Sequence, residues 1–254
     1  MTRSSTHGDR LPAAGAGFVW GSQPSVPILR PVVDGVVAGF TTRRGGVSGP
    51  PYDELNLSFR VGDDDELVRR NRALASSAVG LAPSWSVVRQ VHGSGVVPAP
   101  APGVVPAADA MWTDDPSRTL AVLGADCVPV LLVTDARLGV AHVGWRGLVA
   151  GVIERAVAEV GGRPHLVAGP AIGPCCFAVG DDVARAFEDR FGASVVSDGH
   201  VDLWAAAGRV AETAGAAAFS AARLCTACHP ELYFSHRRDR GRTGRMALIA
   251  GLAR

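Results

Sequence analysis

The chain has 254 residues, of which 47% are hydrophobic and 19% charged, so it can bury a sizeable core. Its net charge of +1 gives no strong field that would favour nucleic acid or an anionic membrane as a partner. No apolar run approaches the roughly 20 residues that span a bilayer. The first residues also lack the apolar stretch of a signal peptide, so we expect a cytoplasmic protein.

All 25 basic residues are arginines. The absence of lysine excludes a lysine Schiff base and a phosphate-binding loop of the GxxxxGK[ST] type. Any phosphate that binds here must be held by arginine side chains or backbone N–H groups.

In chain order, we predict a disordered tail over residues 1–20 and a single domain over residues 21–254. Residues 28–42 alternate short β-branched runs with glycine, which predicts one or two strands. They lead into a loop with Arg43 and the pair Gly45-Gly46. In that loop the glycines would let a backbone approach a ligand, and Arg43 would clamp a phosphate, unless the loop is only a solvated turn.

A helix is predicted next, with Asp63 and Glu66 as its capping box and Gly80 at its end. Residues 84–97 have the pattern of a strand, with His92 inside it or at its end. Residues 98–108 form a proline-rich loop that cannot pair in a sheet, and this loop is the candidate linker.

The second half alternates short apolar runs with segments of helical periodicity. Strands are predicted at 119–123, 128–134, from 140, 166–168 and 245–252, and helices at 147–160, 181–191 and 202–214. The two kinds of element interleave without strict alternation. The fold class is therefore α/β with α+β character, a layered sandwich of mixed β-sheets with outer helices.

Three residues in this pattern have side chains that bind metals. Cys127 lies between two predicted strands beside Asp126, His142 closes a strand, and His92 precedes a glycine. One thiolate and two imidazoles are a plausible zinc shell, and three protein ligands leave one position open, as in catalytic sites. Each residue also has a structural interpretation, as a small buried hydrophobe, a core histidine or a loop histidine.

Two further features remain ambiguous from the sequence. Cys225-x-x-Cys228-His229 matches a haem attachment string, but no export signal accompanies it. Cys175 and Cys176 would complete a second zinc site with it, although unliganded thiols are the interpretation we prefer. The odd number of five cysteines argues against a disulfide framework.

Arginines near these residues are candidates for binding an anion. Arg146 follows His142 in a Gly-Trp-Arg-Gly turn that leads into a helix and exposes backbone N–H groups. Arg238 belongs to an arginine-dense stretch over residues 233–245, which is either a second anion-binding edge near the site or a solvated basic turn.

Seven segments occur in the order expected of one family. They are TTRRGGVSGPPYDELNLS, VGDDDELVRRNRA, RQVHG, GADCVPVLL, AHVGWRG, GPAIGPCCFAVG and LYFSHRRD with GRTGR. Together they resemble the laccase-domain family, once named multicopper polyphenol oxidases and understood as zinc-dependent purine nucleoside phosphorylases. One departure is Val143, where the family leads us to expect alanine and where the added bulk would narrow the pocket.

The resemblance implies one zinc ion per chain, bound by His92, Cys127 and His142. It implies phosphorolysis of adenosine, inosine, guanosine or methylthioadenosine, with adenosine deamination at the same site. In our hypothesis Arg43, Arg146 and Arg238 hold the phosphate that attacks the ribose C1′. Asp126 protonates the departing base or orients a zinc ligand. For deamination, water activated by the zinc attacks the purine C6.

Two other activities compete with this interpretation. A multicopper oxidase needs about four coppers and many imidazoles, whereas the chain has seven histidines and no His-x-His pair. A Cys–His hydrolase would use Cys127 as nucleophile, His142 as base and Asp126 as orienting group, and would not need His92. A metal-storing or partner-binding module without enzyme activity is the third class.

Overall fold

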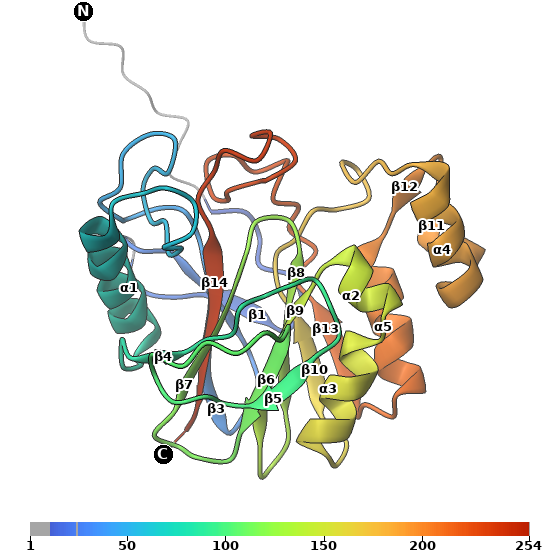
Figure 1. Ribbon diagram of the computed structural model, residues 1–254, viewed down its shortest axis with the longest axis horizontal. Coiled ribbons are helices and arrows are strands. Elements are labelled where there is room, and N and C mark those ends of the chain that lie inside the picture. The colour runs from blue at the N-terminus through green and yellow to red at the C-terminus, as the bar shows by residue number, and fades with distance from the viewer. Residues whose placement is uncertain (1–10, 24, 254) are drawn as a thin grey trace, which may run out of the picture.

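The computed structural model describes residues 11–23 and 25–253, and its centre is formed by two six-stranded sheets (Figure 1). The first sheet has the order β1 (Phe18–Trp20), β2 (Ile28–Pro31), β3 (Val36–Thr41), β14 (Met246–Leu252), β7 (Thr119–Gly124) and β4 (Trp85–Ser86). The second has the order β13 (Ala218–Ala221), β10 (His165–Ala168), β8 (Val128–Val133), β9 (Leu138–Val143), β6 (Ala110–Thr113) and β5 (Val96–Pro98). Both sheets are mixed, because the first combines antiparallel pairs with one parallel pair at an edge, and the second combines them with a parallel pair at each edge.

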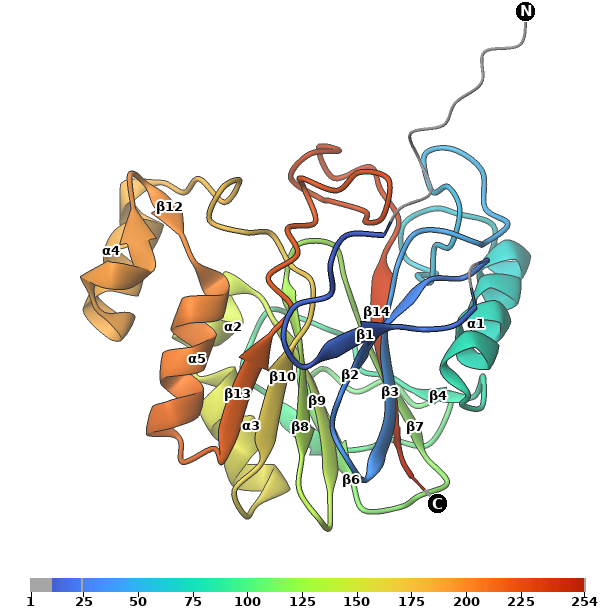
Figure 2. The same ribbon diagram turned by 180° about the vertical axis from the view of Figure 1, so that it is seen from behind.

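The two sheets share one apolar core. Side chains from the first sheet, such as Phe40 and Leu248, belong to the same buried cluster as Leu131, Val140 and Val167 from the second. The view from behind shows the strands of both sheets side by side in the middle of the molecule (Figure 2). Because this core belongs to both sheets, we propose that the described residues fold as one unit.

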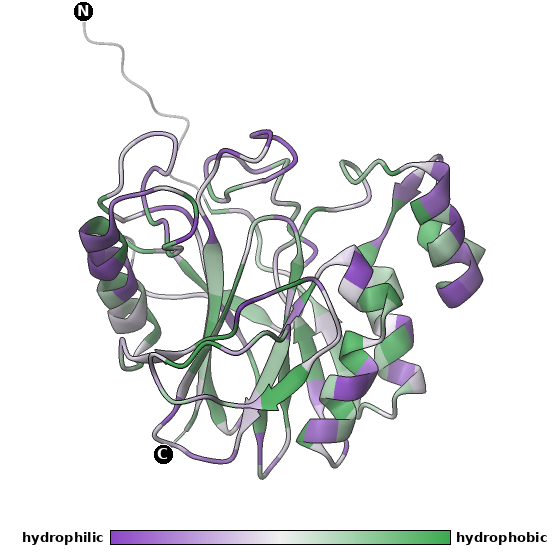
Figure 3. Cartoon of the chain, viewed as in Figure 1, coloured by the Kyte–Doolittle hydropathy of each residue, from purple (hydrophilic) through white to green (hydrophobic). Residues whose placement is uncertain are grey.

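Helices cover the outer faces of the sandwich. They are α1 (Asp65–Val79), α2 (Trp145–Val149), α3 (Val152–Val160), α4 (Asp181–Phe191) and α5 (Leu203–Thr213). Helix α1 packs against the first sheet, and α3 and α5 pack against the second. Their outward faces are hydrophilic, and the strands between them are hydrophobic (Figure 3). The predicted sandwich of mixed sheets with outer helices is confirmed.

The alternation of side chains along β8 and β9 separates the two cores. Val130 belongs to the core under the helices, whereas Leu131 belongs to the core between the sheets. On β9, Val143 lies in the core under the helices, so its neighbour His142 points to the opposite face. Val143 is fully buried there. The expectation that Val143 narrows the functional pocket is therefore wrong, because it faces the helices.

The first third of the chain departs most from the predicted elements. The predicted strand over 84–97 is only β4 and β5, with His92 in a bend between them at φ 58°. Side-chain hydrogen bonds replace the missing strand pairing. The Gln90 amide donates to the carbonyl oxygen of Leu123 and accepts its N–H. The Asp109 carboxylate accepts the backbone N–H groups of residues 91–93. The loop over 98–108, which is predicted not to pair, does pair at its first residue, Pro98 in β5, and in an isolated bridge between Ala107 and Arg89.

Some helix and strand ends also differ. The N-cap of α1 is Asp64, whose carboxylate accepts the N–H groups of Glu66 and Leu67, whereas Asp63 binds Ser48 and Asn56. Gly80 ends this helix at φ 90°, as predicted.

The predicted helix over 147–160 is two helices, since Gly151 between them has φ 86°. Of the predicted tail over 1–20, residues 1–10 lie outside the described residues, and residues 18–20 form β1. A two-stranded sheet of β11 (Val196–Ser197) and β12 (His200–Val201) lies beside α4, with a short 3₁₀ turn, η1 (Ala193–Val195), before it. Over residues 11–23 and 25–253, no helix has the length and apolar character of a bilayer crossing.

Candidate metal centre and active site

Three segments far apart in sequence bring His92, Cys127 and His142 together. Cys127 lies where the chain crosses from β7 in the first sheet to β8 in the second, and His142 lies on the adjacent strand β9, opposite Pro129. The ligand atoms of the three side chains lie within 4.8 Å of one another. The two imidazole rings meet edge to face, with centroids 4.9 Å apart. This is the group that the sequence predicts as a metal shell.

A buried carboxylate, Asp109, orients both histidines. Its Oδ1 lies 2.9 Å from His142 Nδ1 and accepts the backbone N–H of His92 at 2.9 Å. Its Oδ2 accepts the N–H groups of Val91 and Gly93. Since Nδ1 of His142 is bound to Asp109, Nε2 is left to face a metal. A carboxylate behind a ligating histidine is the usual arrangement around zinc.

The charges of this group are strongly interdependent. Burial raises the pKa of Cys127, but the imidazoles of His142 and His92 outweigh it and lower this pKa to about 6. Burial lowers the pKa of His142, but the Cys127 thiolate and Asp109 raise it to about 9. Asp109 keeps a pKa below its usual value, because hydrogen bonds from His142, Gly93 and Val91 outweigh its burial. The site therefore favours a thiolate, which is the form that binds metals.

The glycines of the Gly-Trp-Arg-Gly turn are explained by the closeness of α2 to these ligands. A Cβ on Gly144 would lie 2.9 Å from His92 Cδ2 and 3.2 Å from Cys127 Sγ. A Cβ on Gly147 would lie 2.8 Å from the carbonyl oxygen of Gly93. Glycine at both positions lets the start of α2 close one side of the ligand group. His92 remains exposed on another side, so the site is open to solvent.

Asp126 does not contact the histidines, although the sequence places it beside Cys127. Its Oδ1 accepts the hydroxyl of Thr226 at 2.6 Å, and its Oδ2 accepts the N–H of Arg237 at 2.7 Å. The orienting role proposed for Asp126 therefore belongs to Asp109. Asp109 follows the proline-rich loop as a lone acid between alanines, and that polar residue in an apolar run was the signal for it.

The three predicted phosphate-binding arginines have different surroundings. Arg238 donates to Asp239, Thr226 and Tyr233 through all three of its nitrogens. Arg43 donates to Asp53 and Pro230. Both guanidinium groups are thus engaged by the protein itself.

Arg146 differs from these two, since it is exposed and stacks on Trp145 at 4.3 Å. Within the described part of the chain, no hydrogen bond links its guanidinium group to another residue, and only its backbone carbonyl is bonded, to the N–H of Ala150. Arg146 therefore keeps the donors that an anion needs.

The glycine pair beside Arg43 also has a structural explanation. A Cβ on Gly45 would overlap the carbonyl of Ser25, and one on Gly46 would overlap the backbone of Glu54. The expected close approach is thus to the chain's own backbone, which corrects the suggestion of a ligand there. Sequence reasoning missed a different arginine, Arg245, whose side chain is close enough to Cys127 and Asp126 to interact with their charges.

One cavity adjoins the ligand group, and a second lies on residues linked to it. A small one of about 20 Å³ is lined by Cys127, Pro129 and Tyr233 and has room for about one water molecule. A surface cavity of about 420 Å³ is lined by Trp145, Phe177, Val179 and Arg237. Its volume and its aromatic walls suit a small organic ligand. None of the three ligands lines it, but two of its lining residues are linked to the site, since Trp145 follows Gly144 and the backbone N–H of Arg237 donates to Asp126.

The donor set fits zinc. One thiolate, two imidazoles and an orienting carboxylate are a typical three-ligand zinc shell with an open position. In the two described ranges, groups of three or more metal-binding side chains number two, and neither holds more than two histidines. That set is too small for the several imidazole-bound coppers of a multicopper oxidase.

A family model described as multi-copper polyphenol oxidoreductase laccase matches residues 37–253. The chain belongs to this family. Curated proteins to which the chain is similar have another name. A protein of Xylella fastidiosa strain Temecula1, named purine nucleoside phosphorylase, is 43% identical over 87% of this chain and 94% of its own length. The purine nucleoside phosphorylase YfiH of Escherichia coli is 38% identical over 85% of this chain and 94% of its own length.

Two solved structures share the fold of this chain. YlmD from Geobacillus stearothermophilus superposes with a TM-score of 0.84 at 32% identity, covering 94% of this chain and 99% of that protein. A Neisseria meningitidis protein superposes with a TM-score of 0.82 at 35% identity, covering 94% of this chain and all of that protein.

Proposed function

We propose that this laccase-family chain is a purine nucleoside phosphorylase with one catalytic zinc ion bound by His92, Cys127 and His142. The observation that carries the proposal is the open three-ligand group beside an aromatic cavity of about 420 Å³. A zinc ion bound there would supply a Lewis acid that polarises an oxygen of the substrate or of water. The names of the relatives support a nucleoside and phosphate as the substrates.

The cavity suggests how a nucleoside is held. Trp145 and Phe177 line it, and aromatic side chains stack on purine bases in a way that tolerates different bases. The ribose then lies toward the ligand group, and phosphate attacks C1′ as the glycosidic bond breaks. Arg146 is the best-placed residue to hold this phosphate, because its donors are not engaged by the protein. Arg245 is a second candidate, since it lies near Cys127.

Asp126 has a positioning role in this proposal. Both of its oxygens accept hydrogen bonds from the protein, so it joins the Cys127 crossover to Thr226 and to the backbone of Arg237. Arg237 in turn lies 5.2 Å from the ring centroid of Phe177 in the cavity wall. Asp126 thereby connects the metal ligands to the cavity, and this arrangement favours positioning over proton donation to the base.

Incubation of adenosine with and without phosphate tests the proposal. We expect adenine and ribose 1-phosphate only when phosphate is present. Adenosine deamination at the same site is a further part of the proposal, and it predicts inosine without phosphate. Separation of adenine, inosine and hypoxanthine by chromatography distinguishes the two. A product pattern that does not depend on phosphate would remove the phosphorylase proposal.

One observation favours a second candidate, the Cys–His hydrolase. Cys127, His142 and Asp109 form a thiolate, an imidazolium and an orienting carboxylate, as a cysteine nucleophile requires. Asp109 here takes the place that the sequence suggested for Asp126. The two candidate functions differ in whether they require His92, since the zinc enzyme needs it as a ligand and the hydrolase does not need it. Activity that survives His92→Ala but not Cys127→Ala would support the hydrolase and contradict the zinc enzyme.

The cytoplasm is the compartment we propose, because a reducing environment keeps thiols available as metal ligands. All five cysteines are free.

A further inference from the structure

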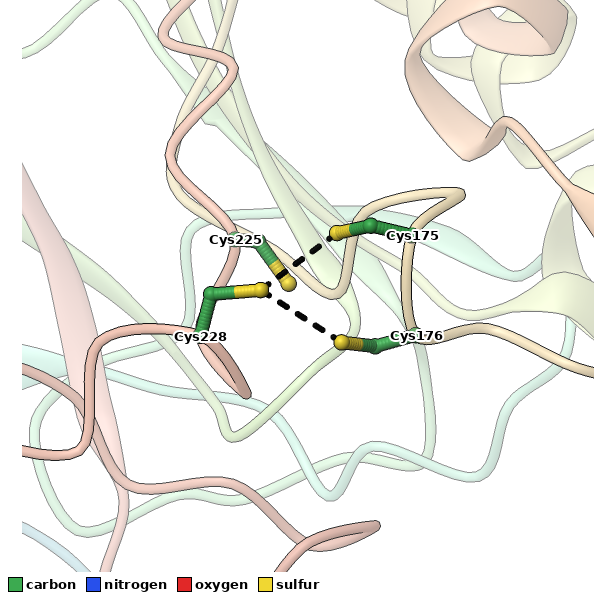
Figure 4. Close-up of side chains that lie close together, drawn as sticks. All are labelled: Cys175, Cys176, Cys225 and Cys228. Atoms are coloured by element: carbon green, nitrogen blue, oxygen red, sulfur yellow. Dashed lines mark hydrogen bonds between the residues drawn. The ribbon is translucent and has the colours of Figure 1, made fainter.

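Four cysteines gather in a second group, separate from the three catalytic candidates (Figure 4). Cys175 and Cys176 lie in the loop that follows β10, and Cys225 and Cys228 lie in the loop that follows β13. Their four Sγ atoms lie within 4.8 Å of one another. The sulfur of Cys228 is 3.4 Å from that of Cys175 and 3.4 Å from that of Cys176. All four side chains point toward a common centre.

The spacing of the sulfurs is that of a single tetrahedral metal ion. Zinc–thiolate bonds of about 2.3 Å place the sulfurs of a tetrahedral site roughly 3.8 Å apart. In a multi-iron cluster the cysteines bind different iron atoms around a larger core, which a group this compact has no room for. Disulfide pairing would join Cys228 to one sulfur, but the structure places it equally near two.

The backbone around Cys225 is arranged to stabilise a thiolate. The N–H of Gly173 donates to Cys225 Sγ at 3.2 Å, and the N–H of Cys228 also interacts with this sulfur. Such N–H groups are typical second partners of metal-bound thiolates. Gly173 has little room for a side chain, because a Cβ would lie 3.3 Å from Cys175 Sγ and 3.2 Å from Cys225 Cβ. The two loops are thus held close by backbone contacts as well as by the sulfurs.

We infer that Cys175, Cys176, Cys225 and Cys228 bind a second, structural zinc ion. Four protein ligands leave no open position, which is the pattern of structural rather than catalytic zinc. The site joins the two loops that flank the catalytic crossover. Thr226, between two of the cysteines, donates to Asp126 and is bonded to Ala171 in the other loop. The second zinc therefore stabilises the surroundings of Cys127 without contacting the substrate.

Metal content measured on protein purified under reducing conditions tests the inference. We expect two zinc ions per chain in the wild type and one in His142→Ala, which keeps only the four-cysteine site. The double variant Cys225→Ser/Cys228→Ser should also hold one zinc ion, and its melting temperature should fall. His229→Ala is the matched control, because His229 adjoins Cys228 but lies outside the cluster, and it should keep both ions.

The His142→Ala chain also provides a test that does not require the cysteine variants to fold. A mercurial that titrates thiols should release its zinc, and Co²⁺ in its place should show thiolate-to-cobalt charge-transfer bands. A His142→Ala chain without zinc would overturn the inference, as would a mass that shows a disulfide among the four cysteines or iron in place of zinc. Loss of phosphorolysis alone would instead concern the proposed function, since the metal count of the cysteine site does not depend on it.

Discussion

Two groups of metal-binding side chains lie near each other and differ in ligand type and openness. They are the three-ligand group of His92, Cys127 and His142 and the four-cysteine cluster. The first combines two imidazoles with one thiolate, leaves one side open and is oriented by the buried carboxylate of Asp109. The second consists of thiols alone, closes around its centre and uses backbone N–H groups as its further partners.

The comparison shows how one fold keeps a proposed catalytic metal site apart from a proposed structural one. A carboxylate behind a histidine tunes a ligand that must remain reactive, whereas four thiolates bind a metal tightly and leave no place for a substrate. Asp126 and Thr226 connect the two groups through a 2.6 Å hydrogen bond. The proposed catalytic site thus adjoins the proposed structural site.

Removal of metal should separate the two sites most clearly. A chelator should abolish phosphorolysis before it lowers the melting temperature, because the open site has one thiolate and an exposed His92. Activity, zinc release and thermal unfolding followed on the same sample check the order. A melting temperature that falls first would contradict our assignment of the open and closed sites.

Loss of a ligand should affect one site and spare the other. We expect His142→Ala to lower kcat/KM by more than the roughly 100-fold that is typical of changes behind a metal ligand, because the metal itself is lost. One zinc ion should remain in the cysteine cluster. His200→Ala serves as the control, since the imidazole of His200 lies outside both groups and bonds the backbone of Asp198. Full activity in His142→Ala would exclude this site as the catalytic centre.

The orienting carboxylate should matter less than the ligands. We expect Asp109→Asn to lower metal affinity or kcat by roughly 10- to 100-fold, because His142 loses its charged partner. Zinc binding followed by titration, together with kcat, measures this effect. Asp126→Asn is the comparison, because Asp126 does not contact the histidines, and it should weaken zinc binding less than Asp109→Asn does. If Asp126→Asn weakens zinc binding as much as Asp109→Asn, the two roles are wrongly assigned.

The smallest effect should come from the substrate side of the open site. We expect Arg146→Ala to raise the KM for phosphate by about 10-fold, the equivalent of one charged hydrogen bond, and to leave both metals in place. Deamination without phosphate should not change. Arg155→Ala, which removes an exposed arginine on α3, is the control. An unchanged KM for phosphate in Arg146→Ala would show that Arg146 does not bind the phosphate, and Arg245 would be the next residue to test.

Much of the layered fold could be predicted from local pattern. Short apolar runs located β7, β8, β9, β10 and β14, and Gly80 located the end of α1. Prediction failed where side chains replace strand partners, as in the segment around His92, which Gln90 and Asp109 hold in place. Such bonds join residues that are distant in sequence, and no periodicity reports them.

The amino-acid sequence by itself determined which residue types are available for chemistry. It offered one cysteine and two histidines for an open site, four further cysteines, and arginine as the sole basic side chain for anions. The folded chain decided how these groups are used. It selected Asp109 over Asp126 as the partner of His142, engaged Arg43 and Arg238 in structural bonds, and joined Cys175 to Cys228 across 53 residues. The physical reason is that residue type sets what a group is able to bind, whereas the crossing of two sheets sets what lies within bonding distance.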